Sequence, residues 1–109
     1  MAVSVMIKRK VKPGEQARKL IPMILQLRAL ATYQPGYISG ETLRNVSHPE
    51  ECLVISTWES LQDWEKWHHS KQRTTINSRI ESLTGESTDY NIYEPMVGRT
   101  FQETAPQKE

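Results

Sequence analysis

Residues 52–70 read CLVISTWESLQDWEKWHHS, and this stretch decides the fold. Four apolar residues in a row, Cys52–Ile55, predict a strand that is covered on both faces and runs to Glu59. Ser60 then stands where a helix N-cap is expected, and Asp63, three residues later, nearly completes a capping box. The stretch therefore predicts a buried strand that passes directly into a helix.

The helix that follows this strand is rich in aromatic residues. Apolar and aromatic side chains recur there at helical spacing: Leu61, Trp64, Trp67, His68, Ile76, Ile80 and Leu83. Ser70 is a second candidate N-cap, so the region is expected to form either one helix or two short ones. Gly85 is expected to end it, because glycine readily takes the left-handed conformation of a helix C-cap.

The chain before this stretch predicts a strand followed by a helix. Residues 3–11 alternate between apolar and polar side chains, which is typical of a strand, and a Pro-Gly pair then breaks the pattern. From Glu15 the apolar residues recur at helical steps, which indicates a helix that ends around Tyr33. Pro22 lies inside this helix, so we expect a kink or a restart there.

Two further strands are expected, over residues 37–45 and 90–97. Pro95 places the last strand at a sheet edge or takes the chain out of the sheet, because proline cannot donate a ladder hydrogen bond. Residues 98–109 are polar and lack periodicity, so we expect a flexible tail. The sequence thus predicts one domain over residues 1–97, followed by this tail.

The predicted element order is β-α-β-β-α-β, which is typical of an α+β, ferredoxin-like domain. Four antiparallel strands would form the sheet, and the helices would pack on one of its faces. The other face would be left bare, with apolar residues from the third and fourth strands on it. A chain of 109 residues would cover such a face with a second copy of itself, so we expect a homodimer.

Composition excludes some classes of partner. Lys and Arg number 14 and Asp and Glu 13, so the near-neutral charge argues against nucleic acid. The basic run Lys8, Arg9, Lys10 and Lys12 is expected to lie on a solvated strand edge, with alternate members on opposite faces. Cys52 is the single cysteine, so it forms no intrachain disulfide and is expected to be a buried, unreactive thiol.

The sequence shows no targeting or membrane segment and few catalytic motifs. It has neither the apolar stretch of a signal peptide nor a run of ~20 apolar residues, so we expect a cytoplasmic protein without a membrane partner. Phosphate-binding, dinucleotide-binding and nucleophile-elbow motifs are absent. Adjacent His68 and His69 diverge on a helix and have no third ligand at suitable spacing, so no metal site is expected.

Three stretches resemble the antibiotic biosynthesis monooxygenase family. They are VKPGE at 11–15, PGYISGE at 35–41, and LVISTWES at 53–60 with the Trp and Ser residues that follow it. The three stretches occur in the order that the family shows, and the resemblance covers roughly residues 3–97. It implies a dimeric α/β barrel, in which two sheets pack together and each subunit has a pocket between its helices and its sheet.

The resemblance implies either of two reactions. Characterised members of the family are cofactor-independent oxygenases of phenols or quinols, or haem-degrading enzymes. The haem branch has a Trp on the second helix, which Trp67 matches, and an axial His ten residues later, where this chain has Asn77. Its strand Asn is replaced here by Ile7 or Lys8. Because Asn is a poor haem ligand, haem degradation is the less favoured reaction.

We therefore expect a monooxygenase that acts on a small aromatic or quinol substrate without a cofactor, with haem and flavin left open. The candidate catalytic residues are Trp67, His68 and Asn77, with His68 as a base whose pKa lies near neutrality. The candidate substrate-binding residues are Trp58, Trp64, Arg73 and Tyr90. Such a site needs a pocket of roughly a few hundred Å³.

Each candidate residue also has a plainer interpretation. The tryptophans would pack the core, because aromatic side chains bury large areas. His68 would be a partly buried histidine, Arg73 and Asn77 would lie on a helix surface, and Tyr90 would be a sheet residue. The chain would then be a non-catalytic dimeric module that binds a small molecule or serves a larger assembly.

Overall fold

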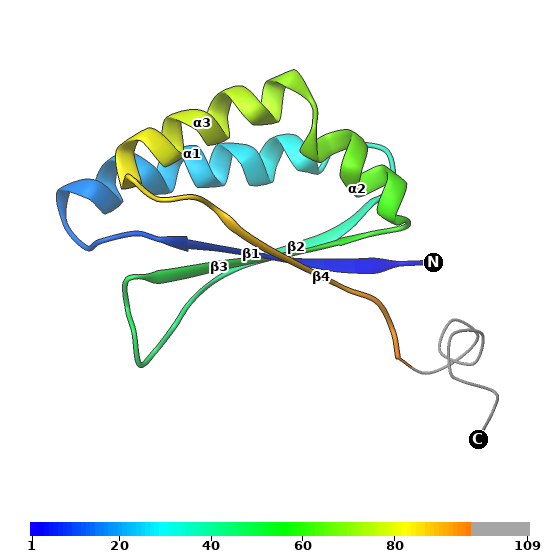
Figure 1. Ribbon diagram of the computed structural model, residues 1–109, viewed down its shortest axis with the longest axis horizontal. Helices are drawn as coiled ribbons and strands as arrows, with labels where there is room; N and C mark the ends of the chain where they lie inside the picture. The colour runs from blue at the N-terminus through cyan, green and yellow to red at the C-terminus, as the bar shows by residue number, and fades with distance from the viewer. Residues whose placement is uncertain (97–109) are drawn as a thin grey trace.

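The structure, a computed structural model, describes residues 1–96. Its elements in chain order are β1 (Val3–Lys10), α1 (Glu15–Ala31), β2 (Tyr37–Arg44), β3 (Glu51–Trp58), α2 (Leu61–His68), α3 (Lys71–Thr84) and β4 (Asp89–Tyr93). Figure 1 shows the helices together on one side of the sheet. The tail expected over residues 98–109 lies outside the described residues.

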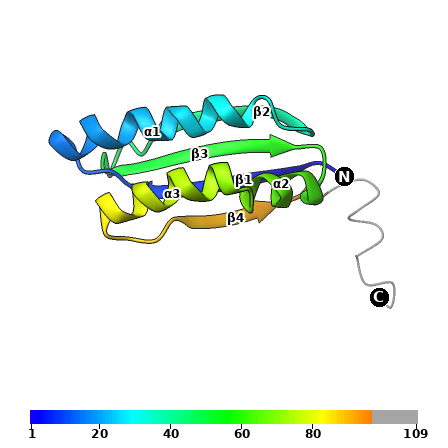
Figure 2. The same cartoon turned by 90° about the horizontal axis from the view of Figure 1, so that it is seen from above.

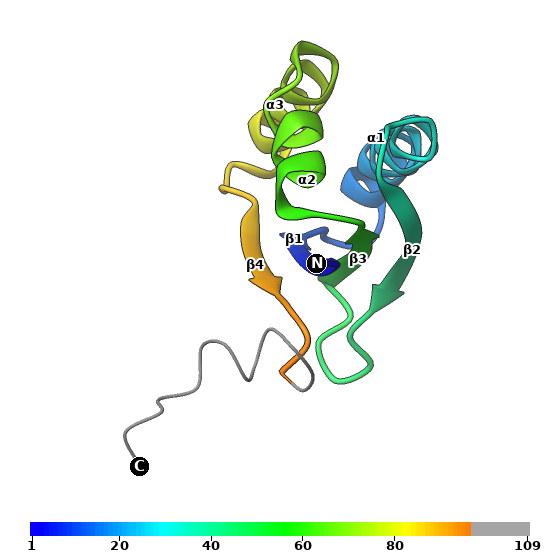
Figure 3. The ribbon, with the colours of Figure 1, turned by 90° about the vertical axis from the view of Figure 1, so that its right-hand side faces the viewer.

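The four strands form one antiparallel sheet in the order β2-β3-β1-β4. Seen from above, α1 runs along the β2 and β3 half, whereas α2 and α3 run along the β1 and β4 half (Figure 2). The end-on view shows none of the described helices or strands over the opposite face of the sheet (Figure 3). The predicted α+β, ferredoxin-like fold is therefore confirmed.

Strand alternation determines which side chains enter the core. Val5 and Ile7 of β1 face the helices together with Val54 of β3, which pairs with Ile7 in the ladder. Fourteen apolar residues are buried in one cluster: Val3, Val5, Ile7, Val11, Leu20, Ile24, Leu27, Ala31, Val54, Trp58, Trp64, Trp67, Ile76 and Ile80. The core thus fills the layer between the sheet and the helices.

The basic run on β1 does not lie at a sheet edge, so that prediction is wrong. β1 pairs with β3 on one side and with β4 on the other, which makes it a central strand. Arg9 shares the alternation of Val5 and Ile7, so its side chain enters the core and is only 5% exposed. Lys8 and Lys10 are exposed, as their opposite parity requires.

The helices begin at the predicted caps. Ser60 Oγ accepts a hydrogen bond from the Asp63 backbone N–H at 3.1 Å, and Ser70 Oγ accepts one from the Arg73 N–H at 3.2 Å. The region after β3 therefore forms two helices. α1 runs unbroken through exposed Pro22, so no restart occurs there. No helix among the described residues is long and apolar enough to cross a lipid bilayer.

The predictions for the last strand and for Cys52 can also be compared with the structure. β4 is an edge strand that ends at Tyr93, before Pro95, as expected. Cys52 is half-buried rather than buried, and burial raises the pKa of its thiol, which keeps the thiol protonated and unreactive.

The turn between α1 and β2 depends on Gly36. The Tyr37 N–H donates to the Gln34 carbonyl at 3.2 Å, and Gly36 has a φ of 84°, as a type II turn requires. A Cβ at this position would collide with the Asp63 side chain, which caps α2. Gly36 therefore lets the turn lie directly against the start of α2.

We expect Gly36→Ala to lower the free energy of unfolding by about 3 kcal/mol, because a clash adds to the cost of a positive φ. Gly85→Ala is the matched control: its φ is 74°, but nothing lies within 4 Å of the added Cβ. It should cost only about 1 kcal/mol. Urea denaturation followed by circular dichroism measures both, and equal losses would contradict the close approach of Gly36 to α2.

Candidate functional site

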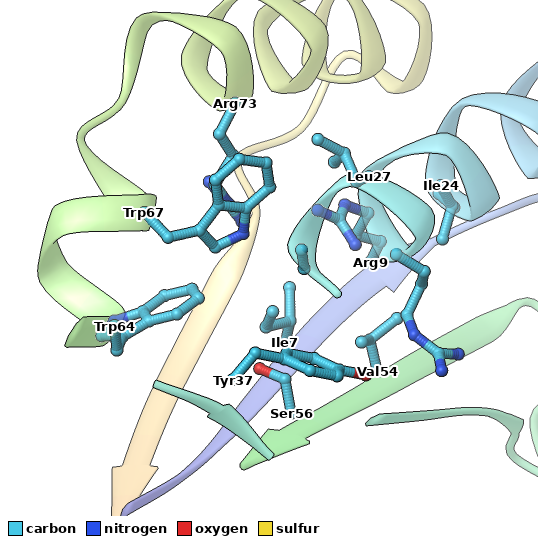
Figure 4. Close-up of a pocket in the computed structure, with 12 residues that line it drawn as sticks. Ile7, Arg9, Ile24, Leu27, Tyr37, Val54, Ser56, Trp64, Trp67 and Arg73 are labelled. Carbon is cyan, nitrogen blue, oxygen red and sulfur yellow. The ribbon is translucent and has the colours of Figure 1, made fainter. Parts of the chain in front are cut away.

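A cavity lies between the helices and the sheet (Figure 4). Its floor comes from β1, β2 and β3, and its roof comes from α1, α2 and the start of α3. Its 12 lining residues are Ile7, Arg9, Ile24, Leu27, Arg28, Ala31, Tyr37, Val54, Ser56, Trp64, Trp67 and Arg73. Aromatic rings and guanidinium groups therefore face one space inside the domain.

The cavity is smaller than predicted. Its volume is about 30 Å³, which is room for one or two water molecules. The expected volume of roughly a few hundred Å³ is wrong for this structure, because side chains from the helices and from the sheet enclose a much smaller space. An aromatic ring can enter only if some of these side chains move.

Two of the three tryptophans line the cavity. Trp64 and Trp67 lie on α2, where their spacing of three residues turns both indoles toward the sheet, and they are 1% and 4% exposed. Trp58 lies outside the lining and is fully buried: its Nε1 donates to Ser56 Oγ at 3.0 Å, and its ring meets Tyr37 edge-on at 5.4 Å. Trp58 thus supports the wall that Tyr37 and Trp64 present to the cavity.

His68 and Tyr90 also lie outside the lining, behind Trp64. The His68 ring stacks on Trp64 with centroids 4.9 Å apart and planes 16° apart, and Tyr90 packs against His68 at 4.7 Å. Burial, aided by the positive charge of Arg73 and by His69, lowers the pKa of His68 to about 4. The imidazole is therefore neutral at pH 7 but is a weak base.

Arg73 lies at the roof of the cavity. Its side chain is held by aromatic faces, because the guanidinium carbon lies 5.3 Å from the Trp64 ring centre and 5.2 Å from that of Tyr90. Arg73 is 3% exposed. The predicted helix-surface position is thus wrong, and a positive charge is buried beside the tryptophans.

Asn77 positions a second buried arginine that the sequence analysis missed. The Arg9 Nη2 donates to Asn77 Oδ1 at 2.9 Å, which connects β1 to α3. The amide nitrogen of Asn77 lies 3.3 Å from both Glu81 Oε2 and Thr88 Oγ1. Asn77 is buried outside the cavity lining and not on the helix surface, so its contact with the cavity is made through Arg9.

A third arginine closes the cavity beside β2. Arg28 of α1 donates from Nη1 to Thr42 Oγ1 at 2.5 Å and from Nη2 to the Gly40 carbonyl at 2.7 Å. Its Nε is buried and has no hydrogen-bond partner among the described residues. Neither Arg28 nor Arg9 was a candidate from the sequence, although the parity of Arg9 with Val5 and Ile7 could have identified it.

The described side chains of the site are poorly suited to bind a metal ion or haem. No three of the His, Cys, Asp and Glu side chains within residues 1–96 come together as ligands. The position of the haem-branch histidine is taken by Asn77, whose amide already bonds Arg9, Glu81 and Thr88. These residues do not fit an axial haem ligand.

The low pKa of His68 makes stability depend on pH. His68 takes up a proton near the ordinary pKa of 6.5 in the unfolded chain, but only near 4 in the folded chain. The contribution of neutral His68 to the free energy of unfolding is therefore complete above pH 6.5 and is lost as the pH falls from 6.5 to 4. Between about pH 7.5 and about pH 5, we expect His68→Gln to remove about 1 kcal/mol of the loss seen in the wild type, after allowance for solvent screening.

Urea denaturation at the two pH values measures this difference. His48→Gln, at an exposed turn position, is the control and should keep the pH dependence of the wild type. If the His68→Gln protein loses as much stability as the wild type over this pH range, His68 does not titrate as described.

Comparison with known proteins identifies solved structures with this architecture. No curated protein matches the sequence. A conserved protein from Methanosarcina mazei Go1 has a TM-score of 0.77 at 20% identity, covering 85% of this chain and 91% of the other. SnoaB of Streptomyces nogalater, described as a cofactor-independent oxygenase, has 0.74 at 12% identity, covering 86% and 92%. Rv0793 of Mycobacterium tuberculosis has 0.76 at 13%, covering 90% and 98%.

Identities this low establish a shared fold and nothing more. The sequence model for antibiotic biosynthesis monooxygenases matches residues 2–79, which is most of the chain. This match covers β1, α1, β2, β3, α2 and α3 as far as Arg79. The chain therefore belongs to the antibiotic biosynthesis monooxygenase family.

Proposed function

We propose that this protein is a cofactor-independent monooxygenase whose small aromatic or quinol substrate binds in the cavity between the helices and the sheet. One observation carries the proposal: indole rings and buried guanidinium groups line the same space. Membership in a monooxygenase family supports the reaction class, and the description of SnoaB as a cofactor-independent oxygenase supports the absence of a cofactor.

The chemistry follows from the charge of the lining. A quinol that loses a proton becomes an electron-rich anion that can reduce O₂ directly. One oxygen atom then enters the ring and the other leaves as water, so a quinol and O₂ give a hydroxyquinone and water. Guanidinium groups in a site of low dielectric would stabilise the anion and promote its formation.

We assign the residues of the site distinct parts in this reaction. Trp67 would lie against the substrate ring, and its indole N–H would donate to a substrate oxygen. Arg73 would stabilise the anion. His68 would act as a positioning residue that holds the Trp64 ring, because its low pKa and its place behind that ring do not suit a base. Asn77 would position Arg9.

We also propose that two copies pair through the bare face of the sheet. Ile55 of β3 lies opposite Met6 of β1 in the ladder, and Leu43 of β2 lies opposite Leu53, so these four apolar side chains share the face that no helix covers. Leu43 is 44% exposed. A contiguous apolar surface of this kind favours an interface between copies.

Oxygen uptake with a panel of naphthoquinols tests the reaction. Trp67→Phe keeps a ring but removes the indole N–H, so we expect it to lower kcat/KM by about 100-fold. Tyr33→Phe changes an exposed aromatic residue and serves as the control. If folded wild-type protein consumes no oxygen above the spontaneous rate with any quinol, the proposal is wrong and the chain is better regarded as a binding module.

Light scattering after gel filtration tests the dimer. The wild type should have twice the monomer mass, and Ile55→Lys, which places a charge in the centre of the bare face beside Glu41, should convert it to a monomer. Leu25→Lys puts the same charge on an exposed position of α1 and should remain dimeric. A dimeric Ile55→Lys protein would mean that the copies pair through another surface.

A further inference from the structure

The cavity has an unbalanced charge. Three arginines line it, Arg9, Arg28 and Arg73, and none of the lining residues is acidic. Arg9 and Arg73 are 5% and 3% exposed. Charged side chains this deeply buried are normally paired with an opposite charge. The lining therefore lacks the anions that its cations would be expected to contact.

Arg9 is only partly satisfied by the protein. Its Nη2 donates to the neutral amide of Asn77, and its Nε is buried without a hydrogen-bond partner among residues 1–96. The nearest carboxylate in this chain of contacts belongs to Glu81, which lies behind Asn77 and accepts from the Thr88 N–H at 2.8 Å. Burial and the charge of Arg73 lower the pKa of Arg9 to about 10, so at pH 7 it still carries its charge.

Among residues 1–96, Arg73 has no anionic partner either. The ion pairs found within the described residues involve Lys8, Lys10 and Lys19, and neither Arg9 nor Arg73 takes part in one. The contacts of the Arg73 guanidinium are the faces of Trp64 and Tyr90. Stacking of this kind leaves the in-plane N–H groups free to donate to a ligand.

We propose that the substrate of this cavity is an aromatic acid, whose carboxylate is bound by Arg9 and Arg73 while its ring packs against Trp67. A carboxylate has two oxygens in one plane, which match the paired N–H groups of a guanidinium better than a single phenolate oxygen does. It is also ionised at pH 7 before it binds, so its single negative charge offsets one of the two buried positive charges from the start. This inference rests on the proposed function in that it takes the same cavity as the substrate site.

Binding of two probes of equal shape tests the charge requirement. Benzoate and neutral benzamide are titrated into the full chain at pH 7, with quenching of tryptophan fluorescence as the readout. We expect benzoate to bind at least about tenfold more tightly than benzamide. Arg73→Gln should weaken benzoate binding by about the same factor and leave benzamide unchanged. Arg79→Gln removes an exposed charge from the same helix and should retain the preference of the wild type.

The comparison of benzoate with benzamide on the wild-type protein tests the proposal even if an arginine variant does not fold. Equal affinity for the two probes, or no binding of benzoate at all, would overturn the proposal. An Arg73→Gln protein that is folded and keeps the full preference would overturn the role of Arg73. Neither probe is oxidised in this experiment. Failure of the oxygen-uptake test would therefore leave the benzoate preference standing, and loss of the preference would leave the oxygenase proposal standing.

Discussion

The hydrogen bond from Arg9 to Asn77 joins the central strand to the last helix inside the core, and the character of the cavity depends on it. It orients the guanidinium of Arg9 toward the space under α1. The other β1 residues that line this side of the sheet, such as Ile7, are apolar. Because the amide is neutral, it fixes the position of Arg9 without cancelling its charge. Removal of Asn77 would leave that charge buried with one partner fewer, which is costly in a protein interior.

The fold was predictable because local patterns and global topology agree. The alternation of β1, the caps at Ser60 and Ser70 and the glycine after α3 each specify one element boundary, and the structure places those boundaries within a residue or two. The bare face of the sheet followed from the element order alone. What failed was the placement of the basic run, because a central strand and an edge strand have the same alternation and differ only in their neighbours.

The site was less predictable, for a physical reason. Helical spacing identified Trp64, Trp67 and Arg73, which do line the cavity. It could not show that Trp64 separates His68 from that cavity, since this depends on side-chain packing between elements. Arg9 was missed because an arginine within a basic run is usually solvated, although its parity with Val5 and Ile7 predicts an inward side chain. Its partner in the core, Asn77, lies 68 residues away and could not be inferred from the local pattern.

The chain belongs to the antibiotic biosynthesis monooxygenase family and has a cavity whose lining is aromatic and cationic, and we propose that an aromatic acid binds in this cavity. The most direct test is a crystal structure of the protein soaked with a dihydroxynaphthoate under anaerobic conditions. We expect density for the ring against Trp67 with the carboxylate at the Arg9 guanidinium, and Leu27 or Arg28 displaced. Density for the ligand only at the surface, with the cavity still closed, would contradict the proposal.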